Sequence, residues 1–357
     1  MVSSAPWWDA ARFAARKPLL EARSAMMGAL RGYFAGQGFA EVETPILQIS
    51  PGLEPHLKAF ATTLNDPAGQ PSRPLYLHTS PEFAMKKLLA AGLPRIFQVA
   101  HTFRDGERAD THHPEFAMLE WYRTGEGLDA IINDCAALLR ATWLAVPEEL
   151  RGDPKNGGGL RWKGRACDPM RRPEVLSVAD AFRRYASGIE ILTTAPDPMK
   201  PDAERLRQMA MHAGIKLPES GDWEDLFFHI FLEHIEPKLG IGAPTALVDY
   251  PLSMAALAKK SARDPRVADR VELYVAGLEL ANGFAELTDA AEQRRRFEAD
   301  MEKKERLYGE RYPLDEDFLA ALAHMPEASG IALGFDRLVM LATGAEKIDD
   351  VIWAPVA

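Results

Sequence analysis

Arginines, a histidine and carboxylates that suit phosphate and amine chemistry occur in several separated segments of the sequence. Arg104 follows one strand-like stretch, 95–103, while His112 and Phe116 stand at the start of the next, 115–123. A planar guanidinium can hold a phosphate and a carboxylate together, and an aromatic face can stack an adenine. This hairpin therefore predicts a nucleotide site, although an ordinary surface hairpin with charged turn residues has the same composition.

A second arginine lies near the C-terminus, in the sequence Gly334-Phe335-Asp336-Arg337. The pattern predicts a glycine-bounded strand from Gly330 and then a helix that begins near Phe335, with Arg337 in its first turn. A polyphosphate at a helix N-terminus gains from the helix dipole as well as from an arginine. The competing interpretation is a simple helix cap with a salt bridge.

An apolar run in the last third of the chain carries polar residues that are costly to bury without partners. Asn282, Phe284 and Glu286 alternate along the chain, so we expect them on one face of a strand. Hard divalent cations prefer carboxylate oxygens and ATP phosphates, which predicts Glu272 and Glu279 as Mg²⁺ ligands. Asn282 and Glu286 are suited to hold an ammonium group. The alternative is a solvated face of an edge strand.

Two further carboxylates stand in similar contexts: Glu82 two residues after Ser80, and Glu120 two residues before Tyr122. A lysine side chain in a pocket needs a carboxylate for its charge, and its second amino group needs another. Taken singly, each glutamate is more often a helix-start acid or a solvated strand residue.

The surrounding sequence predicts a mixed α+β protein, because strands are interrupted by long helical crossings and include one long antiparallel hairpin. An amphipathic helix is expected over 19–37, where apolar residues recur at helical spacing before a glycine stop. The Gly-, Pro- and Arg-rich stretch 147–173 is interpreted as a surface insertion. Further helices are expected at 128–144, 178–185, 202–213 and 223–239, and strands at 245–249 and 270–281.

The composition fits one compact enzyme domain. The chain has 357 residues, 47% of them hydrophobic and 26% charged, which is enough to bury a full core. Its two cysteines, Cys135 and Cys167, belong to no CxxC or histidine-rich cluster, so neither a disulfide framework nor a zinc site is expected. The absence of a signal-peptide pattern and of a long apolar run predicts a cytoplasmic protein without a membrane span. A net charge of −10 weighs mildly against tRNA as a partner.

Three of these segments resemble the signature motifs of class II aminoacyl-tRNA synthetases. Residues 41–45 look like motif 1, the 104–122 hairpin looks like motif 2, and 334–337 looks like motif 3. Within that class, the sequence ELANGFAELTD at 279–289 and the stretch 112–122 resemble lysyl-tRNA synthetases. The resemblance implies the class II catalytic fold, a mainly antiparallel sheet flanked by helices, and a homodimer built through motif 1.

The resemblance also implies roles for individual residues. Arg104 and Arg337 would be the catalytic groups that hold the ATP phosphates, with Mg²⁺ on Glu272 and Glu279. The nucleotide would also contact Glu107, His112 and Phe116. The amino-acid pocket would be lined by Ser80, Glu82, Glu120, Tyr122, Asn282, Glu286 and Ala332.

Lysyl-tRNA synthetases carry an OB-fold anticodon-binding domain of about a hundred residues ahead of motif 1. Here the motif 1 helix is expected to begin near Leu19, which leaves no OB-fold, a short extension at 1–18 and a catalytic domain at 19–357. This arrangement is similar to the elongation factor P lysyltransferases, which attach lysine or (R)-β-lysine to a lysine of elongation factor P. Ala332, in place of a usual glycine, is expected to favour the β-amino isomer by only about 1–3 kcal/mol.

Two positions depart from the family pattern. Motif 2 has Arg-x-Glu, whereas here Gly106 occupies the glutamate position and Glu107 follows as its expected substitute. His113 replaces the usual asparagine, so the contacts of this loop are expected to differ.

The expected reaction is the formation of an aminoacyl-adenylate from ATP with Mg²⁺, followed by transfer to an ε-amine. Two alternatives remain open. A shortened lysyl-tRNA ligase would need a basic surface, and the best candidate is the run at 293–296 with Lys303, Lys304 and Arg306. A catalytically silent paralogue would bind only ATP or lysine, but the retention of both arginines and both Mg²⁺-type glutamates argues against it.

Overall fold

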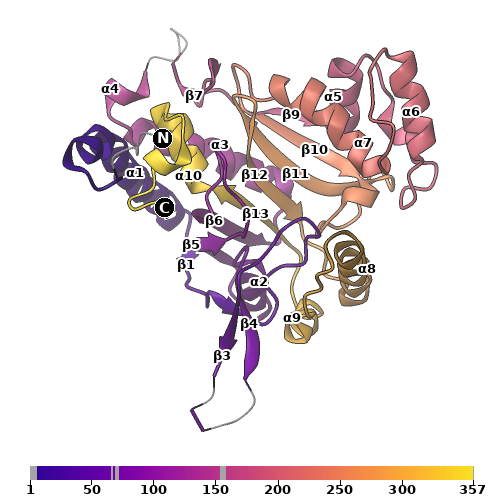
Figure 1. Ribbon diagram of the computed structural model, residues 1–357, viewed down its shortest axis with the longest axis horizontal. Helices are drawn as coiled ribbons and strands as arrows, with labels where there is room; N and C mark the ends of the chain where they lie inside the picture. Colours follow the sequence, from indigo (N-terminus) through magenta and orange to yellow (C-terminus); the bar gives the residue numbers. More distant parts are fainter. Residues whose placement is uncertain (1–5, 66, 69–71, 153–157, 357) are drawn as a thin grey trace.

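The computed structural model describes residues 6–65, 67–68, 72–152 and 158–356. Within these residues the main feature is one eight-stranded sheet (Figure 1). Neighbouring strands are antiparallel except for the pair at each edge, which is parallel. In order across the sheet, the strands are β1 (Ala40–Glu41), β5 (Arg95–Phe103), β6 (Glu115–Thr124), β13 (Ala328–Gly334), β12 (Leu278–Ala285), β11 (Val267–Val275), β10 (Thr245–Pro251) and β9 (Glu174–Ser177). The predicted α+β fold with a mainly antiparallel sheet is confirmed.

Smaller sheets and the helices surround this sheet (Figure 1). The described residues form a three-stranded sheet of β2 (Leu47–Gln48), β4 (Arg73–Leu77) and β3 (Ala61–Leu64), and a hairpin of β7 (Leu160–Trp162) and β8 (Arg165–Cys167). The helices are α1 (Ala10–Gly36), α2 (Glu82–Ala90), α3 (Leu128–Ala145), α4 (Glu148–Arg151), α5 (Val178–Tyr185), α6 (Ala203–His212), α7 (Trp223–Ile230), α8 (Ala290–Tyr308), α9 (Glu316–Leu322) and α10 (Phe335–Thr343). None of the helices in the described residues is long and apolar enough to cross a membrane.

Alternation along β6 separates the core from the site. Ala117, Leu119 and Trp121 are buried in the cluster formed with α1, α3 and α10. Because successive strand residues point to opposite faces, Glu120 and Tyr122 lie on the other face, and Tyr122 joins the cluster built from α2, α8 and α9. One strand therefore supports the core with one face and the candidate site with the other.

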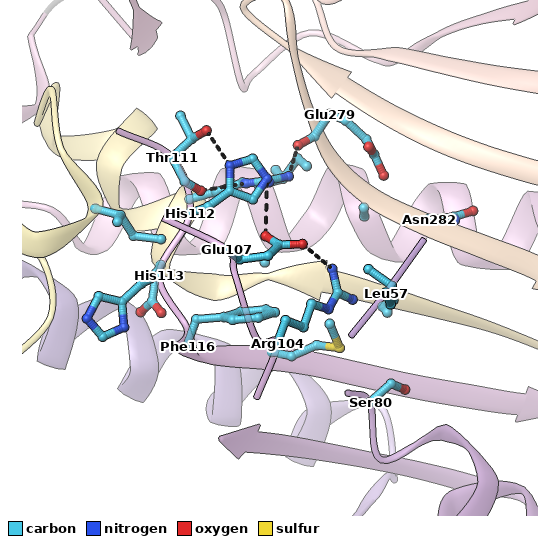
Figure 2. Close-up of a pocket in the computed structure, with 18 of the residues that line it drawn as sticks. Leu57, Ser80, Arg104, Glu107, Thr111, His112, His113, Phe116, Glu279 and Asn282 are labelled. Carbon is cyan, nitrogen blue, oxygen red and sulfur yellow. Dashed lines mark hydrogen bonds and ion pairs between the residues drawn. The ribbon is translucent and has the colours of Figure 1, made fainter. Parts of the chain in front are cut away.

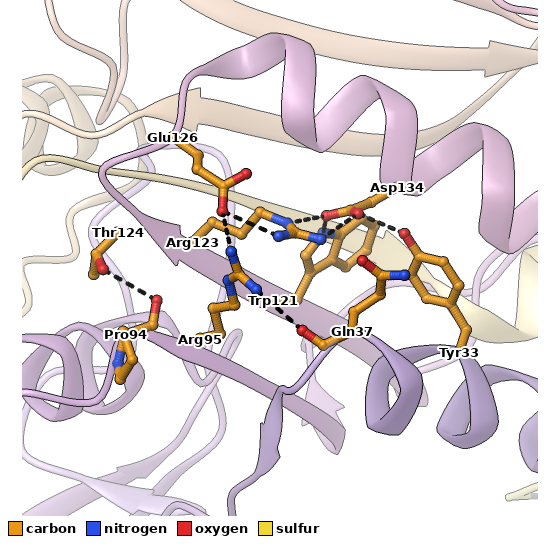
Figure 3. Close-up of polar contacts among 9 residues, drawn as sticks. All are labelled: Tyr33, Gln37, Pro94, Arg95, Trp121, Arg123, Thr124, Glu126 and Asp134. Atoms are coloured by element: carbon orange, nitrogen blue, oxygen red, sulfur yellow. Dashed lines mark hydrogen bonds and ion pairs between the residues drawn. The ribbon is translucent and has the colours of Figure 1, made fainter.

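A buried carboxylate fastens the helical layer to β6 (Figure 3). Asp134 of α3 accepts hydrogen bonds from Arg123 Nε at 2.7 Å and Trp121 Nε1 at 3.0 Å. It also accepts one from the hydroxyl of Tyr33 on α1, at 2.5 Å. Because one carboxylate accepts hydrogen bonds from all three residues, it fixes the positions of α1, α3 and β6 relative to one another.

The first helix begins earlier than the sequence predicted. It starts at Ala10, because Asp9 caps it by accepting hydrogen bonds from the N–H groups of Ala11 and Arg12 at 3.1 and 3.0 Å. Pro18 lies inside the helix. The division of the chain into 1–18 and 19–357 stays a prediction.

The expected single strand over 270–281 is wrong. β11 and β12 form a hairpin whose tight turn is made by Ala276 and Gly277, with φ values of 53° and 77°. Two successive residues with positive φ match the right-handed twist of the two strands. As a result, Glu272 lies directly opposite Asn282.

The segment 147–173, expected as a surface insertion, contributes to the core. Residues 153–157 of this segment lie outside the described residues. The β7–β8 hairpin places Leu160, Trp162 and Cys167 among the buried residues of the main cluster. Arg161 Nη2, between two of these residues, donates to the carbonyl of Leu150 at 2.8 Å.

Candidate active site

A cleft lies over the central strands β6, β13 and β12, on the face of the sheet opposite α1 and α3 (Figure 2). It brings together most of the residues that the sequence singled out. The predicted residues that line it are Ser80, Glu82, Arg104, Glu107, His112, Phe116, Glu279, Asn282, Ala332 and Arg337.

Arg337 is aimed into one end of the cleft by three contacts. Its Nε donates to the Thr111 carbonyl at 3.2 Å and its Nη1 to the Glu279 carbonyl at 3.1 Å. Its Nη2 lies 2.5 Å from His112 Nε2. Burial, and then the charge of Arg337, lower the pKa of His112, so a neutral imidazole is expected to accept the hydrogen bond from the guanidinium.

Arg104 faces the same end from the motif 2 hairpin (Figure 2). Its guanidinium carbon lies 5.2 Å from the centre of the Phe116 ring. Glu107 bridges the arginine and the histidine, with Oε1 3.9 Å from Arg104 Nη1 and Oε2 3.5 Å from His112 Nε2. The buried Nε of Arg104 has no hydrogen-bond partner among the described residues.

The start of α10 is locked onto β6 and α1. Buried Asp336 accepts a hydrogen bond from the Ala117 N–H at 2.7 Å and forms an ion pair with Arg23 of α1. Because Arg337 follows Asp336 directly, this lock also fixes the position of the arginine.

The opposite end of the site is acidic and buried. Glu120 accepts hydrogen bonds from Ser80 Oγ at 2.5 Å and from the Tyr122 hydroxyl at 3.0 Å. Burial, and then the nearby Glu82 carboxylate, raise the pKa of Glu120 to about 8. Glu120 and Tyr122 do not line the open cleft, but they contact its wall through Ser80.

Lys86, which the sequence analysis missed, neutralises two of these carboxylates. Its ammonium group forms ion pairs with Glu82 and, at 2.6 Å, with Glu286. Lys86 and Glu286 are each only 2% exposed, so Glu286 is enclosed behind the cleft wall instead of lining it. Burial raises the pKa of Glu286 to about 7, although Lys86 lowers it. The i,i+4 spacing of Glu82 and Lys86 was the available signal.

Strand register explains how distant residues converge. Glu120, Ala332, Asn282 and Glu272 lie opposite one another across β6, β13, β12 and β11. Paired residues on neighbouring strands share one face of the sheet, so these side chains form a row across it.

The motif 2 loop contacts the last residues of the chain. His113 is buried, and its Nε2 lies 3.1 Å from the Val356 N–H. Arg108 Nη2 donates to the Val356 carbonyl at 2.8 Å. The loop is therefore tied to the C-terminal segment.

Comparison with known proteins identifies the family. The family model for class II tRNA synthetases (D, K and N) matches residues 4–357. The chain belongs to this family. An elongation factor P--(R)-β-lysine ligase of Haemophilus influenzae (strain PittGG) is 39% identical over 331 residues, 92% of each chain. Proteins of the same name from Sodalis glossinidius (strain morsitans) and Salmonella paratyphi B (strain ATCC BAA-1250 / SPB7) are 40% and 39% identical over 99% of this chain and 98% of theirs.

The Mg²⁺ ligands expected for a class II synthetase fit the structure unequally. Glu279 lines the cleft, and burial followed by the Glu272 carboxylate raises its pKa to about 7. Glu272 does not line the cleft, because it accepts hydrogen bonds from the hydroxyls of Tyr250 and Tyr274 and from Arg270, each at 2.5 Å. Two carboxylates that repel each other would be stabilised by a divalent cation, with Glu279 as the better-placed ligand.

Proposed function

We propose that this protein uses ATP to convert lysine or (R)-β-lysine into an aminoacyl-adenylate and then transfers it to a lysine ε-amine of elongation factor P. The observation that carries the proposal is one cleft with two arginines at one end and a group of buried carboxylates behind the other. The curated relatives, which match nearly the whole chain, are named for the same reaction.

In the first step, the amino-acid carboxylate attacks the α-phosphate of ATP, and pyrophosphate leaves. Arg104 and Arg337 both line the cleft, and in this proposal they hold the two anions where these meet; the Nε donor of Arg104 is unused among the described residues. Phe116 offers an aromatic face for the adenine. The protein therefore contributes positioning and charge stabilisation, and no side-chain nucleophile is needed.

The metal would act on the phosphates. Glu279, whose backbone carbonyl accepts a hydrogen bond from Arg337, would hold Mg²⁺ at the arginine end of the cleft, and the Glu272 carboxylate would add negative charge there. When bound, the cation would neutralise the charge of the triphosphate.

The acidic end suits the amino groups of the substrate. Glu82, Glu120 and Glu286 form a group of carboxylates, and Lys86 supplies one internal cation. If all four groups are ionised, the pocket keeps an excess of two negative charges, which matches a substrate with two ammonium groups. Ala332 narrows the cleft between Glu120 and Asn282, where a glycine would leave space for one more methyl group.

In the second step, the ε-amine of the acceptor lysine attacks the adenylate carbonyl. An amide bond forms, the carbonyl–phosphate bond breaks, AMP leaves with the bonding electrons, and the amine loses a proton. Both steps use the same positioned carbonyl carbon, so one cleft serves both.

The tRNA alternative would use the basic run of α8, but this run is largely neutralised. Arg294 pairs with Glu316, while Arg295 and Arg296 both pair with Glu292. Together with the net charge of −10, this pairing supports a protein acceptor over a nucleic acid.

The test is intact-mass analysis of elongation factor P after incubation with the protein, ATP, Mg²⁺ and either α-lysine or (R)-β-lysine. We expect a gain of one lysyl mass on a single acceptor lysine, and the faster isomer names the substrate. Charging of tRNA without any change in the mass of elongation factor P would overturn the proposal.

A further inference from the structure

A loop between β2 and β3 forms one wall of the cleft and is fixed in place from both sides. Thr79 binds the Pro51 carbonyl through its N–H at 3.0 Å and its hydroxyl at 2.8 Å. From α8, the buried ammonium group of Lys304 donates to the carbonyls of Pro55 and Leu57 at 3.1 and 2.7 Å. The residue between these anchors, Glu54, therefore has a defined position.

Glu54 brings a carboxylate to the cleft wall with one oxygen, Oε2, that no other described residue hydrogen-bonds. It lines the cleft together with Ser80 and Glu82. Its Oε2 is shielded from solvent and has no hydrogen-bond partner among the described residues. Burial, followed by the Glu82 carboxylate, raises the pKa of Glu54. A shielded carboxylate without a partner is costly, and a cationic ligand would remove that cost.

Contacts order the carboxylates along the site. Glu54 lines the cleft together with Arg104, Ser80 and Glu82. Glu120 and Glu286 lie behind this wall, because Ser80 binds Glu120 and Lys86 pairs with both Glu82 and Glu286. An extended amino acid whose carboxylate faces Arg104 would reach Glu54 with its nearer amino group and Glu120 with its distal one.

We infer that Glu54 binds the amino group closer to the substrate carboxylate, the α-amino group of lysine or the β-amino group of (R)-β-lysine. This inference rests on the proposed function and names a further substrate-binding residue within it. An ammonium group has three donors, so it can bind Glu54 and Glu82 at once. The site would thereby select diamino acids over acids with only the distal amine.

The test compares lysine with 6-aminohexanoate, which has the carboxylate and the distal amine but lacks the nearer one. Dissociation constants are measured by calorimetry for the wild type and Glu54→Gln. We expect Glu54→Gln to weaken the binding of lysine or (R)-β-lysine by about ten- to a hundredfold. The dissociation constant of 6-aminohexanoate should change by less than about threefold, because this ligand has no amino group that could bind Glu54.

Two controls separate this role from a structural one. Glu286→Gln should weaken both ligands, since both carry the distal amine. Asp300 is a neighbouring acid whose pKa is raised to about 7 by burial and then by Glu54, and it lines a smaller adjoining cavity, which Glu54 also lines, but not the cleft itself. Asp300→Asn should leave the ratio of the two dissociation constants unchanged.

The ligand-free proteins give a second readout. Because Glu54→Gln removes an unpartnered buried charge, its melting temperature should equal or exceed that of the wild type. A lower melting temperature, or equal weakening of both ligands, would overturn the inference. Wild-type protein that binds lysine and 6-aminohexanoate equally well would overturn it while leaving the ligase reaction standing. If elongation factor P gains no mass while Glu54→Gln still weakens lysine more than 6-aminohexanoate, the result rejects the proposed function alone.

Discussion

Glu120 links the protonation of the acidic end to ligand binding. Its pKa of about 8 means that the free pocket carries a proton near neutral pH, whereas a bound ammonium group favours the ionised carboxylate. Lysine binding below pH 8 should therefore release a proton, and affinity should rise with pH by up to about tenfold per unit. Calorimetry at pH 7 in buffers of different ionisation enthalpy measures the release, with ATP alone as the control. Lysine binding without proton release would contradict this assignment.

Lys86 should contribute to stability because it is the cation between two buried carboxylates. Lys86→Met is expected to cost about 3–5 kcal/mol at pH 8. A buried carboxyl whose pKa is raised in the folded state, such as Glu286, destabilises the fold as the pH rises and the group ionises. The stability that Lys86→Met loses should therefore shrink toward pH 5. Urea unfolding at both pH values measures this change.

The adjacent lysine provides the matched control. Lys87 pairs with Asp315 and Asp317 but is partly exposed. Lys87→Met should therefore cost less, about 1–2 kcal/mol, because Lys87 and Asp317 keep contact with water although Asp315 is buried. Equal losses in the two variants, or a Lys86→Met deficit that grows toward pH 5, would show that the buried ion pairs do not carry the effect.

At the scale of elements, the packing of β13 against β6 depends on a glycine. A Cβ at Gly330 would lie 2.2 Å from ring atoms of Tyr122 and 2.8 Å from Glu286 Oε1. Gly330→Ala should displace Tyr122, destabilise the protein by about 1–3 kcal/mol and reduce lysine-dependent exchange of pyrophosphate into ATP. A Cβ at Gly127 would meet nothing within 4 Å, so Gly127→Ala should keep the exchange activity. Full exchange by Gly330→Ala would reject this packing argument.

The contact between α1 and α10 connects helix packing to the nucleotide site. Arg23→Met would leave buried Asp336 without its cation, at a cost of about 3–5 kcal/mol. The KM for ATP should rise, because Arg337 follows Asp336. Urea unfolding and pyrophosphate exchange test both effects. Arg31, whose pairing with Glu41 is exposed, is the control, and Arg31→Met should cost less than about 1 kcal/mol. Wild-type stability in Arg23→Met would contradict the argument.

Elements with a clear period were predictable, and elements that depend on one local conformation were not. Period-two alternation placed Asn282 and Phe284 on the cleft face, as the structure has them. Gly277 was the available signal for the turn, but its partner Ala276, a non-glycine residue with positive φ, leaves little signal in an apolar run. Glu54 was missed because it lies in a loop without periodicity, and its role depends on tertiary contacts from Thr79 and Lys304.

At the scale of the whole molecule, the motif 1 segment predicts a homodimer. Ile46, Leu47 and Ile49 are 41%, 47% and 54% exposed and adjacent in sequence, and grouped exposed apolar side chains are typical of an interface. Leu47→Glu combined with Ile49→Glu should place charges in that interface and produce monomers. Sedimentation velocity measures the change, and Met211→Glu, at an exposed position on α6, is the control that should remain dimeric. A wild-type monomer, or a double variant that stays dimeric, would reject this interface.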